Sequence, residues 1–254
     1  MGDSMIGKVA LITGGASGLG RSITSRFAAA GAKVAIADVD FDGGQETEAM
    51  IRESGGEGSF FHVDLSVAAE VEILVEDILK AFGRLDFACN NAGVLAQKIA
   101  PIAEFPEKDW DQVIRHNMKS VFLCMKYELR QMVKEGSGSS VNTASYYGLG
   151  GAGHGVNAYV ASKHGVIGLT RAAALEYATK GIRVNAVCPG HVETPMTAGY
   201  LSDPDRRDEV LSRYPMGRLG TMEEITSTIF WLCSDEASFV TGHAMAVDGG
   251  YVAR

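Results

Sequence analysis

A tyrosine and a lysine four positions apart are the sharpest chemical feature of this sequence. They lie in the run Tyr159-Val160-Ala161-Ser162-Lys163, inside a stretch that predicts a helix. Side chains at this spacing share one face of a helix. A lysine there stabilises a phenolate and lowers a tyrosine pKa that starts at about 10. A tyrosine needs such a pKa to act as an acid or base near neutral pH, although the same spacing also occurs on ordinary surface helices.

Two further polar residues stand where chemistry is expected. Ser145 follows a predicted strand, at the carboxyl end where ligands bind in parallel sheets. Its hydroxyl can hold a carbonyl oxygen beside Tyr159, or it can simply be a turn serine. Asn117 falls in the middle of a predicted helix, where asparagine has poor propensity. It either serves a buried polar network or is tolerated there.

A glycine-rich turn follows the first predicted strand. It reads Thr13-Gly14-Gly15-Ala16-Ser17-Gly18-Leu19-Gly20 and opens a helix. Glycines let the backbone turn tightly and approach a ligand. The helix N-terminus offers unpaired N–H groups to a pyrophosphate. The spacing G-x-x-x-G-x-G differs from the general dinucleotide fingerprint, so a plain tight turn is the alternative.

Asp38 ends the second predicted strand. An acidic side chain at this place hydrogen-bonds the adenosine ribose and repels a 2′-phosphate. Neither Ser17 nor Val39 supplies a cation for that phosphate. These residues favour NAD over NADP, and the alternative for Asp38 is a solvated turn aspartate.

These residues depend on alternating strands and helices for their positions. Short apolar runs predict strands, which we place at 8–12, 33–37, 58–63, 85–89, 139–143, 183–187 and 244–247. Amphipathic stretches predict helices, which we place from the glycine turn to about 30, and at about 41–53, 67–82, 107–134, 157–179 and 222–233. This alternation predicts an α/β fold, a single Rossmann-like doubly wound parallel sheet of about seven strands with helices on both faces.

The composition excludes several classes of protein. The 254 residues contain no repeat or linker, so we expect one domain over residues 1–254. A net charge of −8 disfavours nucleic acid and anionic membranes as partners. No apolar run is long enough for a membrane span, and the first residues do not form a secretory signal. The four cysteines are widely separated and the six histidines form no ligand pair, which predicts a cytoplasmic protein without a metal.

The ordered set of motifs resembles the short-chain dehydrogenase/reductase family over nearly the whole chain. The motifs are Thr13–Gly20, Asp38, Asn90-Asn91-Ala92-Gly93, Asn117, Ser145, Tyr159 with Lys163, and Pro189-Gly190. The resemblance implies that Tyr159 is the acid/base, that Lys163 lowers its pKa and binds the nicotinamide ribose, and that Ser145 orients the substrate oxygen. It further implies that Asn117 helps to hold a water in a proton relay.

The resemblance also implies a set of cofactor-binding residues. They are Gly14, Ser17, Gly18, Leu19, Gly20, Asp38, Asp64, Leu65, Asn91, Ala92, Gly93, Tyr159, Lys163, Pro189, Gly190, Val192 and Thr194. Asp64 and Leu65 flank the adenine, and Val192 and Thr194 hold the nicotinamide carboxamide. Asp64 as a turn cap and Pro189-Gly190 as a strand end are the simpler alternatives.

One spacing departs from the family. Fourteen positions separate Ser145 from Tyr159, one more than is usual. We interpret the extra residue as an extension of the loop between Gly148 and Gly155. If it instead shifts the end of the strand, Thr143 becomes the alternative hydroxyl.

The substrate pocket is expected to be apolar and aromatic. Its expected residues are Leu95, Ser145, Tyr146, Tyr147, Leu149, Met196 and Tyr200. Residues 189–220, called the lid segment below, are irregular and rich in proline and glycine, which predicts closure over the substrate. The expected substrate is a neutral, fairly hydrophobic secondary alcohol or ketone, and cyclic alcohols are among the candidates.

The expected activity is hydride transfer between NAD(H) and that alcohol or ketone. The Tyr159/Lys163 spacing favours C–O over C=C chemistry, because enoyl-reducing relatives place more residues between the two. The alternatives are a 3-oxoacyl-type reductase, a catalytically idle NAD-binding sensor or scaffold, and a structural interaction protein. The resemblance also implies a homotetramer that pairs the helices at 107–134 and 157–179.

Overall fold

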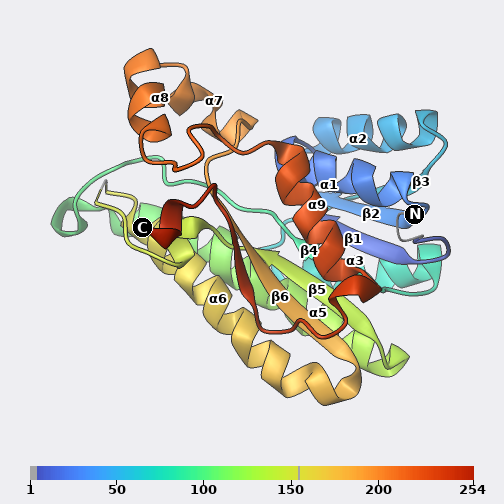
Figure 1. Ribbon diagram of the computed structural model, residues 1–254. Helices are drawn as coiled ribbons and strands as arrows, with labels where there is room; N and C mark the ends of the chain where they lie inside the picture. The colour runs from blue at the N-terminus through green and yellow to red at the C-terminus, as the bar shows by residue number, and fades with distance from the viewer. Residues whose placement is uncertain (1–4, 154) are drawn as a thin grey trace.

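A computed structural model of the chain describes residues 5–153 and 155–254. Seven parallel strands form one sheet in the order β3-β2-β1-β4-β5-β6-β7 (Figure 1). The strands are β1 (Val9–Thr13), β2 (Lys33–Asp38), β3 (Glu57–His62), β4 (Phe87–Asn90), β5 (Gly138–Thr143), β6 (Ile182–Pro189) and β7 (Ala244–Val247). The predicted sheet is thus confirmed. The strand order reverses between β1 and β4, where such sheets bind ligands.

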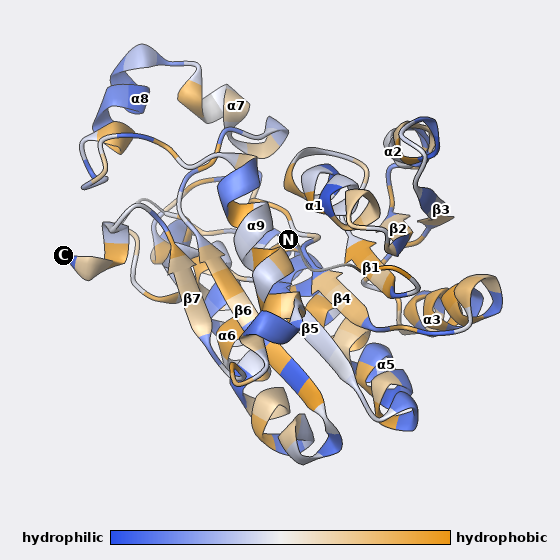
Figure 2. Cartoon of the chain, turned by 45° about the vertical axis from the view of Figure 1, so that its right-hand side comes forward, coloured by the Kyte–Doolittle hydropathy of each residue, from blue (hydrophilic) through white to orange (hydrophobic). Residues whose placement is uncertain are grey.

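Helices cover both faces of the sheet. They are α1 (Gly18–Ala29), α2 (Phe41–Glu53), α3 (Ala68–Phe82), α4 (Glu107–Ile114), α5 (Ser120–Glu135), α6 (Asn157–Tyr177), α7 (Pro195–Leu201), α8 (Pro204–Leu211) and α9 (Met222–Cys233). One core packs α1, α2 and α9 against the sheet, and the other packs α3, α5 and α6. Successive residues of β1 serve the two cores alternately, because side chains alternate along a strand. This explains why strands such as β1 and β4 are apolar and largely orange in Figure 2, whereas β3 at the edge of the sheet is blue.

The predicted helix over 107–134 is interrupted. A five-residue π-helix at Arg115–Lys119 separates α4 from α5. Asn117 lies in this turn and is fully buried. Irregular helical turns of this kind are frequent at functional sites. The hydrophobic periodicity continues through the turn, so the sequence pattern does not reveal the wider turn.

The lid segment is more regular than predicted, since it contains α7 and α8 (Figure 1). Thr194 precedes Pro195 and Asp203 precedes Pro204, and in each pair the first residue caps a helix that the proline begins. The two helices are short, with one of seven and one of eight residues. Their start signals are visible in the sequence, but the helices are too short to show a clear period.

Two kinds of feature, a membrane-spanning helix and a metal-binding group, were considered for the described residues. No helix in the described part of the chain is long and apolar enough to cross a membrane. Within the same residues, no group of three or more His, Cys, Asp or Glu side chains is placed to bind a metal ion. The four cysteines are free and buried.

Candidate active site

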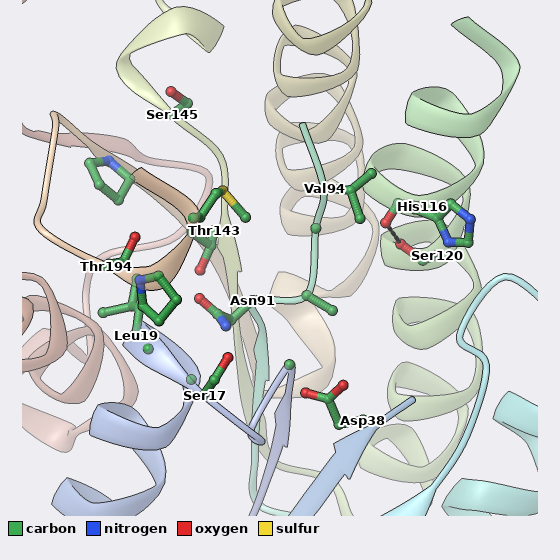
Figure 3. Close-up of a pocket in the computed structure, with 18 of the residues that line it drawn as sticks. Ser17, Leu19, Asp38, Asn91, Val94, His116, Ser120, Thr143, Ser145 and Thr194 are labelled. Atoms are coloured by element: carbon green, nitrogen blue, oxygen red, sulfur yellow. Dashed lines mark hydrogen bonds between the residues drawn. The ribbon is translucent and has the colours of Figure 1, made fainter. Parts of the chain in front are cut away.

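A cleft of about 420 Å³ lies at the carboxyl ends of the central strands. Figure 3 shows Ser145 and Asp38 toward its opposite ends, with Asn91 and Thr143 between them. Every residue that the sequence assigns to cofactor binding lines this cleft, together with Ser145 and Met196. The parallel sheet brings together residues that lie up to 183 positions apart in the chain, since the lining runs from Gly14 to Thr197.

The glycine turn is shaped for close contact with a ligand. A Cβ atom at Gly20 would lie 1.9 Å from the carbonyl oxygen of Gly14, so no other residue fits there. Gly14 has a φ of +69°, which favours glycine. Ser17 is the N-cap of α1, yet its side chain makes no capping hydrogen bond. Its hydroxyl and the first N–H groups of α1 therefore form a donor set suited to a pyrophosphate.

Asp38 lies at one end of the cleft, where two backbone N–H groups hold its carboxylate. Ala16 donates to one carboxylate oxygen and Asp40 to the other, each at 3.0 Å. Among the described residues that line the cleft, Lys163 is the only lysine or arginine, and it lies at the other end beside Tyr159. The Asp38 carboxylate is thus held in one orientation, and no lysine or arginine of the described cleft lining lies next to it. These residues fit the adenosine ribose of a dinucleotide and oppose a 2′-phosphate.

Asp64 and Asn91 are also held by hydrogen bonds. Burial alone would raise the pKa of Asp64, but hydrogen bonds from Ser66 bring it below its ordinary value. The N–H of Ser66 donates to the Asp64 carboxylate at 2.8 Å. The N–H of Asn91 donates to the Thr13 hydroxyl at 2.9 Å, which ties the wall of the cleft to β1.

Ser145, Tyr159 and Lys163 meet at the open end of the cleft. Ser145 lies close enough to Tyr159 to lower the pKa of the phenol, against the effect of burial. The Lys163 ammonium lies 5.4 Å from the centre of the Tyr159 ring and donates to the Thr143 carbonyl oxygen at 2.7 Å. The extra residue after Ser145 is therefore absorbed in the loop before α6, and Thr143 contributes a carbonyl rather than replacing the Ser145 hydroxyl.

The pKa values differ from the expectation for this pair. Burial raises the pKa of Tyr159 to about 12, although the nearby Ser145 side chain acts in the opposite direction. Burial lowers the pKa of Lys163 to about 8. The expected lowering of the tyrosine pKa is thus absent from this structure. Burial removes water from around the Tyr159 phenol and raises its pKa, and the Lys163 ammonium points to the Thr143 carbonyl oxygen.

Asn117 does not line the cleft. Its side chain accepts from the N–H of Val94 at 2.7 Å and donates to the carbonyl oxygen of Val94 at 2.9 Å and to Ser162 at 3.3 Å. The buried polar network considered for this residue is therefore present. Behind the cleft, a Cβ atom at Gly93 would lie 3.2 Å from the Asn117 amide oxygen and 3.7 Å from the Lys163 amine, so Gly93 leaves room for both.

The remaining pocket residues divide into two groups. Leu95, Tyr146, Tyr147 and Leu149 lie outside the lining of the cleft, although Tyr147 packs edge-on against Tyr159 with ring centres 6.4 Å apart. The side chain of Tyr200 is outside the described part of the structure. Several other residues that line the cleft belong to none of the motifs recognised in the sequence. They are Val39, Val63, Val94, His116, Ser120, Ala144, Pro195 and Thr197. Most of them adjoin a recognised motif, and this adjacency was the only signal available.

Known proteins share this arrangement. A family model described as Enoyl-(Acyl carrier protein) reductase matches residues 14–252. A 2,5-dichloro-2,5-cyclohexadiene-1,4-diol dehydrogenase from Sphingobium indicum is 43% identical over 99% of each chain. A cyclohexanol dehydrogenase from Acinetobacter sp. is 39% identical over 100% of this chain and 98% of its own. The crystal structure of levodione reductase superposes with a TM-score of 0.94 at 39% identity, covering 98% of each chain.

The fold and site define a nicotinamide-dependent oxidoreductase, and the comparisons place it more closely. The chain belongs to the short-chain dehydrogenase/reductase family and is of its alcohol dehydrogenase and ketoreductase type. Similar structures contain either nicotinamide cofactor. One from Agrobacterium tumefaciens holds NADP at 38% identity and a TM-score of 0.90. An NAD⁺-bound xylitol dehydrogenase matches at 31% identity and a TM-score of 0.93.

Proposed function

We propose that the enzyme uses NAD(H) and acts on a neutral, hydrophobic secondary alcohol with a six-membered ring, or on the corresponding ketone. The observation that carries the reaction is the meeting of Ser145, Tyr159 and Lys163 at one end of a cleft whose other end holds Asp38. The ring is suggested by relatives whose names specify cyclohexanol and a cyclohexadiene diol. No observation favours the 3-oxoacyl reductase alternative over this one.

Each residue has a defined part in the proposed reaction. The bound nicotinamide would accept or donate the hydride. In the oxidative direction Tyr159 acts as the phenolate, after its own proton has passed to solvent, and takes the hydroxyl proton of the alcohol, while Ser145 holds the substrate oxygen beside it. Lys163 supplies positive charge behind Tyr159 and a contact for the cofactor ribose. The water-holding role assigned to Asn117 stays a prediction, since its side chain is committed to Val94 and Ser162.

The preference for NAD rests on the charge and orientation of Asp38. Its carboxylate is fixed by Ala16 and Asp40, so it cannot turn away from a 2′-phosphate without losing two hydrogen bonds. A cytoplasmic location is proposed on the four free cysteines, which suit a reducing compartment.

The test is NADH formation over a matched panel of alcohols. Cyclohexanol and cyclohexane-1,4-diol should give a higher kcat/KM than open-chain 2-hexanol or a charged hydroxy acid, and NAD should be preferred to NADP. Asp38→Asn keeps the size and one acceptor but removes the charge, so it should narrow the cofactor preference. Equal use of NADP by the native enzyme would refute the cofactor proposal. A preference for the hydroxy acid would refute the substrate proposal.

A further inference from the structure

Four aromatic side chains from separate parts of the chain pack together beside the active site. We call His191, Tyr146, Tyr214 and Tyr251 the His191 cluster. Tyr146 is next to Ser145, His191 follows the Pro189-Gly190 turn, Tyr214 comes after α8, and Tyr251 lies in the C-terminal turn. Tyr146 and Tyr251 have ring centres 4.5 Å apart, and Tyr214 and Tyr251 are separated by 5.3 Å. Figure 1 shows the C-terminal turn next to the segment between β5 and α6.

His191 lies at the polar centre of this cluster. Its backbone N–H donates to the Tyr214 hydroxyl oxygen at 2.7 Å. The Tyr214 oxygen also lies 2.8 Å from Nδ1 of His191, and the Tyr146 oxygen lies 3.3 Å from the same nitrogen. The Tyr214 hydroxyl accepts from the backbone and keeps its own hydrogen, which it can donate to Nδ1 in the neutral tautomer that carries its hydrogen on Nε2. Burial lowers the pKa of His191 to about 4, with Arg213 as the lesser cause, which agrees with a neutral ring.

On one side the cluster reaches the catalytic tyrosine. Tyr146 stacks on Tyr147 with ring centres 4.1 Å apart, and Tyr147 packs edge-on against Tyr159. Ser145 itself accepts from the N–H of Tyr147 at 3.2 Å, which fixes the start of this turn. A displacement of Tyr146 would therefore move Tyr147, whose ring packs edge-on against the ring of Tyr159.

On the other side the cluster holds the lid segment. Tyr214 belongs to a small third core with Leu201, Val210 and Leu219, separate from the two cores of the sheet. It packs so closely on the turn after β6 that a Cβ atom at Gly190 would lie 2.9 Å from its ring. The hydrogen bonds between Tyr214 and His191 are thus a direct polar connection between the core of the lid segment and the turn that follows β6.

We propose that His191 is a positioning residue that sets the affinity for the alcohol. Through the short contact of Nδ1 with the Tyr214 hydroxyl and its longer contact with the Tyr146 hydroxyl, it holds the lid segment and the Ser145–Tyr147 turn at the spacing that receives the substrate. It does not touch the reacting atoms and takes no proton from them. The inference rests on the proposed function for its kinetic consequence, but its structural consequence is independent of turnover.

The experiment compares three variants in the full-length enzyme. His191→Leu removes the acceptor, Tyr214→Phe removes the closer donor, and His191→Asn keeps an acceptor near the position of Nδ1. Leaving buried polar groups unpaired in the first two should raise KM for cyclohexanol about tenfold. kcat and the Kd for NADH should stay within about twofold, since the hydride and proton path is intact. His191→Asn should restore most of the affinity, and Tyr177→Phe on α6 is the matched control.

Hydrogen exchange provides the readout that does not need turnover. His191→Leu should speed exchange in peptides covering 146–149 and 195–214, while peptides from β1 and α5 stay unchanged. An unchanged KM and unchanged exchange in His191→Leu would overturn the inference. So would an equal loss of kcat, NADH binding and substrate affinity, or a His191→Asn enzyme no better than His191→Leu. If the native enzyme oxidises no cyclic alcohol but the exchange pattern is as expected, the proposed substrate is wrong and the positioning role stands.

Discussion

The pKa of Tyr159 shows how the surroundings of a single side chain control its ability to take up or release a proton. A phenol with a pKa of about 12 holds its proton at neutral pH, so a base is created only when positive charge is added near its oxygen. The ammonium of Lys163 is close to the ring, but it is directed at the Thr143 carbonyl. Burial, together with a lysine directed at another acceptor, thus keeps the Tyr159 pKa above its ordinary value.

The first prediction removes the oxygen of Tyr159. Tyr159→Phe keeps the ring and its edge-on contact with Tyr147. General acid–base catalysis contributes about 10²–10⁴-fold, so kcat should fall by at least about 100-fold while NADH still binds. Steady-state kinetics on a verified alcohol and a fluorescence titration with NADH measure the two quantities. Near-normal turnover would show that another group carries the proton.

At the scale of the elements, the contact between α5 and the sheet contains a buried acid. Glu128 is fully buried, and its carboxylate accepts from the Asn90 amide at 3.1 Å. The same amide donates to Asn142 at 3.0 Å. Among the described residues, one oxygen of Glu128 and the amide oxygen of Asn90 have no hydrogen-bond partner, so a proton on Glu128 supplies a donor that these side chains lack. Burial raises the pKa of Glu128 to about 7, which agrees with a protonated carboxyl group.

The second prediction follows from the pKa of Glu128. In the unfolded chain this acid has its ordinary pKa of 4.5, so the folded state binds the extra proton between about pH 4.5 and 7. The free energy of unfolding should therefore fall as the pH rises through this window, by an amount on the order of 3 kcal/mol. Glu128→Gln mimics the protonated form and should flatten this dependence.

Urea unfolding of both proteins at pH 5, 6, 7 and 8 measures this effect. The exposed Glu76 on α3 provides the matched control as Glu76→Gln, which should keep the native slope. The same slope in native protein and Glu128→Gln would mean that Glu128 is ionised in the fold.

The third prediction concerns the lid segment as an element. Its two helices share a small core of their own and border the cleft through Thr194, Pro195, Met196 and Thr197. Cofactor that fills the cleft adds contacts to these residues, so NAD should slow hydrogen exchange across 192–211. Exchange in β1 and α5 should be unaffected. Identical exchange with and without saturating NAD would exclude closure of this segment.

At the scale of the whole molecule, we propose a homotetramer. The helices expected to pair, α5 and α6, lie on the same face of the sheet and carry exposed apolar side chains, including Phe122 and Leu175 at 48% and 85% exposure. Gly168 has open space around it and Ala172 is exposed, which leaves room for a neighbouring helix. Ala173 is also small, but it faces the core and is not available for such a contact.

The fourth prediction is therefore a disruption of that assembly. Gly168→Arg should dissociate the tetramer because its long charged side chain fills the space for the partner helix, while its helix propensity is higher than that of glycine. Light scattering should report a mass of about four chains of 26.9 kDa for the native protein and less for the variant. The control Ile73→Arg changes an exposed residue on α3 and should remain tetrameric. A native monomer at micromolar concentration would refute the proposal.

Local patterns in the chain were enough to predict the sheet, the order of its motifs and the residues around the cleft. Strand and helix periods are local properties, so β2, α2, α9 and β7 were predicted within a residue of their bounds. The glycine turn, Asp38 and the Tyr159/Lys163 pair were visible because their chemistry depends on residue type and short spacing.

The contacts and the pKa values of these residues could not be predicted in the same way, because they depend on how distant elements pack together. The π-turn at Asn117 arises from a hydrogen-bonded fit to Val94, which no periodicity reports. The pKa values of Tyr159, Lys163 and Glu128 depend on exclusion of water by elements far away in the chain. The contacts of His191 with Tyr146 and Tyr214 likewise join segments that are far apart in the chain, and no regular spacing in the sequence predicts that they meet. The burial and the orientation of a side chain depend on the packing of the complete fold, so a local sequence pattern does not predict them.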